Sequence, residues 1–126
     1  MAEENEQKLL RVELGGEKYT LRPTFECLED IEDSTGRSSI ELLSDFSLQK
    51  IKIKDVAAII RAGIIGDQRR KGNQVTLTVK EVGQMILDEG FAQFISTACI
   101  FLSKAIMPDP NSVPSPDTKQ QKKTAT

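Results

Sequence analysis

The chain has 126 residues, of which 38% are hydrophobic and 29% charged, and its formal net charge is −2. This length suits one domain with its own core, and no apolar run approaches the roughly 20 residues that a membrane-spanning helix needs. Histidine is absent, which removes the commonest general base and the commonest metal ligand and argues against hydrolytic catalysis.

The first seven residues, MAEENEQ, are polar and acidic, and they predict a flexible arm. They lack the basic start and apolar middle of a signal peptide, so the protein is expected to stay in the cytoplasm. Ten of the 19 acidic residues lie before residue 37. With this acidic balance and no long basic stripe, nucleic-acid binding is not expected, because it relies on clustered Lys and Arg.

Residues 10–21 alternate between apolar and polar side chains on both sides of Gly15-Gly16. Two alternating runs joined by a glycine pair are typical of a β-hairpin, since glycine adopts positive φ without steric cost. A two-residue turn places Val12 opposite Tyr19 on an apolar face. A lone hairpin is marginal in water, so this face is expected to pack on the rest of the chain.

Pro23 ends the second strand, and Thr24 is placed to cap a helix over residues 25–34 that stops at Gly36. The side chains expected to face inward from this helix are Phe25, Cys27, Leu28 and Ile31. Its acidic side chains recur at helical offsets on the opposite face and are Glu26, Glu29, Asp30 and Asp33.

This acidic face has three interpretations: a solvated surface, a docking surface for a partner, or a metal site. A cation prefers ligands that converge from several elements, so carboxylates along one exposed helix face are a poor metal site. We therefore predict no metal and keep the acidic face as a candidate partner-binding surface beside the simpler solvated one.

Two further helices are marked by capping boxes, in which a Ser or Thr is followed three residues later by Glu. Ser38 and Glu41 open a short helix, and Thr78 and Glu81 open a helix that ends at Gly90. The segment SLQKIKI between the short helix and the next one fits either a connector or a brief strand.

The most regular amphipathic pattern covers residues 55–65, with apolar side chains at three- and four-residue spacing. Gly66 is expected to close this helix, and the segment DQRRKGNQ after it to be a polar basic loop. Arg69, Arg70 and Lys71 in this loop are expected to face solvent rather than to contact phosphate.

Residues 91–106 form the most apolar helix, which either sits centrally or carries an exposed apolar face. The partner-binding residues predicted on it are Phe91, Phe94, Ile95, Phe101 and Leu102. The composition then changes to PDPNSVPSPDTKQQKKTAT, which holds four of the five prolines and predicts a disordered tail over residues 108–126.

The sequence thus predicts an α+β fold, mainly α, in which an N-terminal β-hairpin packs on a bundle of about five helices. One domain over residues 8–107 is expected between the flexible arm (1–7) and the disordered tail (108–126). Cys27 and Cys99 lie in apolar helical patterns and are interpreted as core residues. No catalytic residue, metal ligand or cofactor site is predicted, and the chain is expected to be a small binding or assembly module and not an enzyme.

The order of elements resembles the small tail proteins of the gene transfer agent family. The segments that carry this resemblance are VELGGEKYTLRPTFECLEDIEDSTGRSSIELL, KDVAAIIRAGI, LTVKEVGQMILDEG and FLSKAI, within residues 10–106. The most specific of them is LRPTF after the glycine turn, closing at Thr35-Gly36.

The resemblance implies a tail assembly chaperone of a long-tailed bacteriophage, a prophage or a gene transfer agent. Such a protein works in the bacterial host cytoplasm during virion morphogenesis, binds the tape measure protein and helps to recruit the tail tube protein. The apolar helix over residues 91–106 would offer the groove for the client. A homo-oligomer is compatible with this role, and no membrane is involved.

Two other functions are alternatives to the chaperone. The first is a structural tail component, such as a tube or connector subunit that is retained in the virion. The second is a small DNA-binding regulator that would use Arg69, Arg70 and Lys71, and the acidic balance argues against it.

Overall fold

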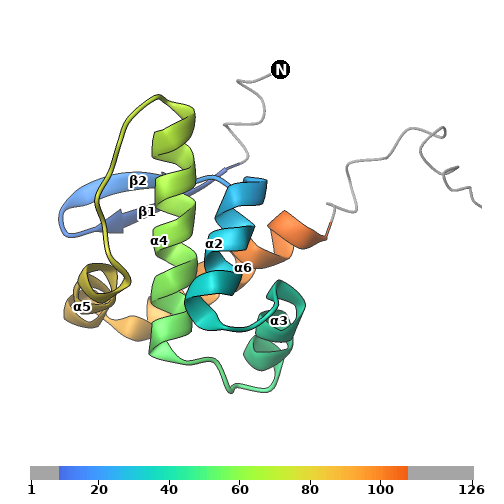
Figure 1. Ribbon diagram of the computed structural model, residues 1–126. Coiled ribbons are helices and arrows are strands. Elements are labelled where there is room, and N and C mark those ends of the chain that lie inside the picture. The colour runs from blue at the N-terminus through green and yellow to red at the C-terminus, as the bar shows by residue number, and fades with distance from the viewer. Residues whose placement is uncertain (1–8, 108–126) are drawn as a thin grey trace, which may run out of the picture.

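The computed structural model describes residues 9–107, which form a two-stranded antiparallel hairpin and five helices (Figure 1). The elements are β1 (Leu10–Leu14), β2 (Glu17–Leu21), α2 (Phe25–Thr35), α3 (Ser39–Ser47), α4 (Ile53–Arg70), α5 (Val79–Glu89) and α6 (Phe91–Ile106). The predicted fold class, a hairpin on a mainly helical bundle, is confirmed. The predicted arm (1–7) and tail (108–126) lie outside the described residues, so the limits of the domain stay a prediction.

The hairpin has the predicted register, with Val12 opposite Tyr19. Gly15 and Gly16 have φ values of 62° and 84°, which a primed two-residue turn requires and glycine adopts without strain. Leu14 and the other inward side chains of β1 pack into the core, so the expected burial of the apolar face is also found.

Helix α4 stands at the centre of the molecule and contacts β2, α2, α5 and α6 (Figure 1). Two thirds of its residues are buried, including two aspartates. A helix that is buried nearly all round needs apolar residues on several faces, and the run from Val56 to Ile60 supplies them. The sequence pattern pointed to α6 as the candidate for a central position, but α4 occupies it.

The prediction that α4 ends at Gly66 is wrong, because the helix continues to Arg70. The first half of the expected basic loop is therefore helical. Gly66 has a packing role instead: a Cβ atom there would lie 2.7 Å from the carbonyl oxygen of Arg22. The chain leaving β2 runs so close to α4 that only glycine leaves room for it.

Gly63, one turn earlier on α4, also lets the end of β2 come close to this helix. A Cβ there would lie 3.0 Å from the Cβ of Leu21, and the Gly63 carbonyl accepts a hydrogen bond of 3.0 Å from the backbone N–H of Arg22. The two glycines therefore form a flat strip on α4 against which the end of β2 rests.

The predicted helix starts are confirmed at three places. Thr24 caps α2, and its hydroxyl accepts from the backbone N–H of Cys27 at 3.0 Å. Ser38 and Thr78 take part in complete capping boxes at the starts of α3 and α5. SLQKIKI forms no strand, so the connector interpretation holds up to the start of α4.

One side chain of the predicted inward stripe of α2 is misplaced. Cys27 and Ile31 are buried and Leu28 is half-buried, but Phe25 is 77% exposed. Phe25 is the first residue of α2 and lines a shallow recess with Gly66, Arg69 and Arg70 of α4, where its side chain stays accessible to solvent.

Candidate functional site

The five apolar residues predicted to bind a partner on α6 are not a continuous surface. Phe94, Phe101 and Leu102 are buried in the core, which corrects the expectation that they face a client. Phe91 and Ile95 are half-buried and pack against that core. The reason is that α6 contacts α3, α4, α5 and β1, so its most apolar side is buried against these elements.

The acidic face of α2 is partly used inside the protein. Asp30 lies 2.8 Å from Nη1 of Arg61 on α4 and also accepts from the hydroxyl of Ser34. Glu26 lies 3.7 Å from Nη1 of Arg69, and both side chains are largely exposed. Asp30 therefore has a structural role within the fold, and its part in a docking surface stays a prediction.

Glu29 and Asp33 remain exposed on this face. Partner binding through them and Glu26 stays a prediction. The segment expected to be a basic loop contributes Arg69 to the same side of the molecule, so the charge there is mixed rather than purely acidic.

An apolar groove of about 540 Å³ lies between α3 and α6. Leu43, Phe46 and Leu48 line it from α3 and its end, and Cys99 and Met107 line it from α6 and its end. Leu48 and Met107 are more than half exposed. The groove thus offers apolar surface to a protein partner.

This groove was not predicted from the sequence. Its signal was present in two apolar residues, Leu48 and Met107, that directly follow helix ends, where polar residues are more usual. Cys99 was expected in the core, but it is half-buried and lines the groove.

A second apolar groove, of about 390 Å³, lies on the surface between α4 and α5. Ile53 and Ala57 line it from α4, and Val79 and Leu87 line it from α5. Gly83 on α5 forms part of its floor and faces Ala57. The two grooves lie against different pairs of helices, so they give the protein two separate apolar surfaces.

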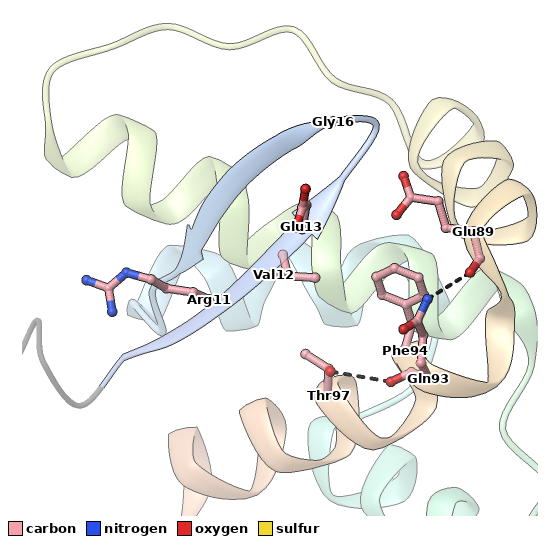
Figure 2. Close-up of a pocket in the computed structure, with 8 residues that line it drawn as sticks. All are labelled: Arg11, Val12, Glu13, Gly16, Glu89, Gln93, Phe94 and Thr97. Atoms are coloured by element: carbon pink, nitrogen blue, oxygen red, sulfur yellow. Dashed lines mark hydrogen bonds between the residues drawn. The ribbon is translucent and has the colours of Figure 1, made fainter.

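The third recess is a cleft of about 460 Å³ between the hairpin and α6 (Figure 2). Its lining residues are Arg11, Val12, Glu13, Gly16, Glu89, Gln93, Phe94 and Thr97. The Gln93 side-chain amide donates to the Glu89 carbonyl, and the Thr97 hydroxyl donates to the Gln93 carbonyl. These polar groups on the helix side are bonded within the helices, and they are not arranged around a vacant ligand position.

The pKa values of Cys27 and Glu41 are displaced, each by its local structure. Burial raises the pKa of the Cys27 thiol to about 12. A hydrogen bond with the Thr24 backbone lowers this pKa, but its effect is smaller than that of burial. The Ser38 backbone N–H that bonds Glu41 holds the pKa of this carboxyl below its usual range. A buried thiol with so high a pKa stays protonated and is a poor nucleophile.

Within residues 9–107, no group of three or more Cys, Asp or Glu side chains is placed to hold a metal ion. In the same range, no helix is both long and apolar enough to cross a membrane.

A protein-family model described as phage tail tube protein, GTA-gp10, matches residues 9–107. The match covers the hairpin and all five described helices. No curated protein and no solved structure matches the chain.

Proposed function

Since the chain belongs to the family described as phage tail tube protein, GTA-gp10, it is a tail protein of a phage or gene transfer agent, and we propose that it is a structural subunit of the tail. The observation that carries this proposal is the family match over the whole of residues 9–107. In this role the protein assembles with other tail proteins, including the tail tube protein, and remains in the finished particle.

The distribution of exposed apolar side chains supports a role in assembly. They are Phe25, Ile40, Leu48, Ile53, Leu87, Ile100 and Met107, and they are spread over α2, α3, α4, α5 and α6 and the chain after α3 and α6. A subunit with several neighbours needs several contact surfaces, whereas a protein with a single ligand needs one. The grooves at α3 with α6 and at α4 with α5 supply two of them.

We propose that the protein acts by binding alone, without catalysis or a cofactor, in the cytoplasm of a bacterial host during tail assembly. The lack of histidine in the sequence and the high pKa of the Cys27 thiol support this proposal. The two apolar grooves have linings suited to side chains of a protein partner rather than to a polar small molecule.

Quantitative mass spectrometry of purified particles tests the structural role. The particles come from the genome that encodes the chain, and peptides of the tape measure and tube proteins serve as internal references. A structural subunit is expected in many copies per particle. Particles that are complete but lack peptides of this chain would overturn the proposal.

The apolar groove between α3 and α6 favours a second candidate, a tail assembly chaperone. A chaperone binds apolar segments of an unassembled client, here the tape measure protein, and leaves before the tail is finished. The groove offers such a segment a place to lie, with Phe46 and Leu48 on one side and Met107 on the other.

Co-expression with the tape measure protein of the same genome separates the candidates. A chaperone keeps this client soluble and elutes with it, yet is absent from purified particles. If the client is equally insoluble with and without the chain, and the chain is found in the particle, the structural role stands.

A further inference from the structure

The outer edge of β1 carries backbone groups that the hairpin does not use. In an antiparallel pair, residues bonded to the partner strand alternate with residues whose N–H and C=O point away from it. The two-residue turn makes Leu14 and Glu17 a bonded pair, so Val12 and Leu10 also bond to β2. Arg11 and Glu13 therefore direct their N–H and C=O groups to the outer edge.

Within residues 9–107 this edge is open at Arg11 and Glu13, whereas the N–H of Gly15, just after β1, donates to the Glu89 carboxylate. The sheet has two strands only, and neither Arg11 nor Glu13 makes a further backbone hydrogen bond in this part of the chain. The edge borders the cleft between the hairpin and α6, where Phe94 and Thr97 lie below β1 (Figure 2). A strand added in this cleft, whose volume is about 460 Å³, would satisfy the unused groups.

We propose that a second copy of this chain fills that space, so that two β1 strands pair antiparallel about a two-fold axis at Val12. For two β1 strands to bond to each other, the residues directly opposite one another must both direct their N–H and C=O groups to the outer edge. With the axis at Val12, Arg11 faces Glu13 of the partner subunit and Glu13 faces Arg11 of the partner subunit. Both opposing pairs are then bonded through their backbones, which gives a four-stranded sheet.

Charge complementarity selects this register. The Arg11 and Glu13 side chains are both exposed on the outer face of the sheet, and each meets the opposite charge in the other subunit. Opposite charges directly across an antiparallel pair stabilise it, and like charges destabilise it. Each two-fold-related dimer contains this ion pair twice.

The neighbouring registers are disfavoured by the same rule. An axis at Arg11 would place Arg11 against the same residue of the partner subunit, and an axis at Glu13 would place two Glu13 carboxylates together. A shift by one residue would oppose an outward-pointing residue with one already bonded to β2, which the ladder does not allow. Only the axis at Val12 combines bonded backbones with paired charges.

The inner face of the sheet continues across this axis with apolar side chains. Val12 lies opposite Val12 of the partner subunit, and Leu10 lies opposite Leu14 of the partner subunit. Val12 and Leu14 are already buried in their own chain. Leu10 is only half-buried in the single chain, so the pairing would cover apolar surface that the fold leaves accessible. This inference goes beyond the proposed role in the tail, because it concerns the isolated protein, and its test does not need the particle.

Charge exchange tests the pairing with sedimentation velocity and native mass spectrometry at high micromolar concentration. The wild-type chain is expected to be a dimer. Arg11→Glu and Glu13→Arg each place like charges opposite one another twice, so each is expected to raise the dimer Kd roughly ten- to a hundredfold. The double variant R11E/E13R restores opposite charges and is expected to return to the wild-type Kd.

Mixing the two single variants provides the decisive observation. A chain with Arg11→Glu carries two acids at the edge and one with Glu13→Arg carries two bases, so they are expected to form a heterodimer. Lys104→Glu on α6 changes the net charge as Arg11→Glu does, and it is expected to leave the dimer intact. A monomeric wild-type chain, an unaffected Arg11→Glu dimer or the failure of the mixed variants to associate would overturn the proposal.

Discussion

Arg22 Nε lies 3.1 Å from Asp67 Oδ1, and the two side chains are 9% and 1% exposed. The pair joins the end of β2 to α4 across 45 positions of sequence. The second carboxylate oxygen of Asp67 lies 3.0 Å from Lys71 Nζ, at the surface end of the helix. This buried ion pair stands beside Gly63 and Gly66, so the chain after β2 is held to α4 by charge where it is closest.

Removal of one partner of this pair is expected to destabilise the fold strongly. Asp67→Asn removes the charged partner of a buried ion pair, and breaking such a pair from one side costs about 3–5 kcal/mol of unfolding free energy. Urea denaturation followed by circular dichroism measures the loss.

The exposed pair of Glu26 and Arg69 is a control, because it also joins an Arg and a carboxylate, here between α2 and α4. Arg69→Gln is expected to cost less than about 1 kcal/mol, since exposed ion pairs are screened by water. Equal losses for the two variants would contradict a special role for the buried pair.

The close approach at Gly66 predicts the effect of one added methyl group. In Gly66→Ala the new Cβ would meet the Arg22 carbonyl oxygen at 2.7 Å, and neither backbone can yield without separating β2 from α4. The variant is expected to lose about 1–3 kcal/mol of unfolding free energy, as overpacked cores do. Thermal and urea denaturation both report this loss.

Gly83→Ala is the control for this substitution. Gly83 lies within α5, and a Cβ there would meet Ala57 at 3.7 Å, an ordinary contact. This variant is expected to gain up to about 1 kcal/mol, because alanine favours the helix over glycine. Destabilisation by both alanines would mean that contact distance does not decide the outcome.

The features that the sequence predicted well depend on residues close together in the chain. The glycine turn, the Thr24 cap and the two capping boxes are each complete within four residues, so their spacing was sufficient. The wrong end of α4 has the opposite cause. Gly66 resembles a helix stop, and its actual reason, the passing chain at Arg22, comes from a distant segment.

The candidate surfaces were less predictable for the same reason. An apolar residue such as Phe101 is equally compatible with a core and with an exposed face until the packing of its helix is known. The pairing of Asp30 with Arg61, 31 positions away, likewise has no local signature. The groove between α3 and α6 arises from two helices far apart in sequence, so only the fold brings its lining together.

The capping box of α3 predicts a pH dependence of stability. The Glu41 carboxylate accepts from the Ser38 N–H at 2.9 Å, and this bond is the main cause of its lowered pKa. A group whose pKa is lower in the folded state contributes fully above its ordinary value of 4.5, and the contribution is lost as the pH falls through the folded value.

Glu41→Gln is expected to flatten this dependence. The glutamine side-chain oxygen still accepts from Ser38 but does not titrate. Between about pH 5 and pH 3, the variant is therefore expected to lose less unfolding free energy than the wild type, with the other carboxylates common to both. Identical pH profiles would show that the capping bond does not favour the ionised carboxylate.

The two cysteines are expected to differ in reactivity. Burial raises the pKa of Cys27 to about 12, whereas Cys99 is partly exposed in the groove between α3 and α6. With Ellman's reagent at pH 8, the native chain is expected to release one equivalent of dye rapidly, and the denatured chain two. Cys99→Ser should abolish the rapid phase, and a rapid phase that persists would mean that Cys27 is accessible.

Substitutions on α3 test whether its groove with α6 is a contact surface in the tail. Leu48, directly after α3, lines the groove and is 59% exposed, and Ile40 within α3 is 69% exposed but lies outside the groove. Leu48→Gln and Ile40→Gln remove similar apolar surface from exposed positions, so both are expected to change the unfolding free energy by less than about 0.5 kcal/mol. Only Leu48→Gln is expected to lower the number of complete particles in an infection or induction assay, because it alone places a polar amide in an apolar contact. Equal particle yields from the two variants would place the contact surface elsewhere, with the groove between α4 and α5 as the next surface to test.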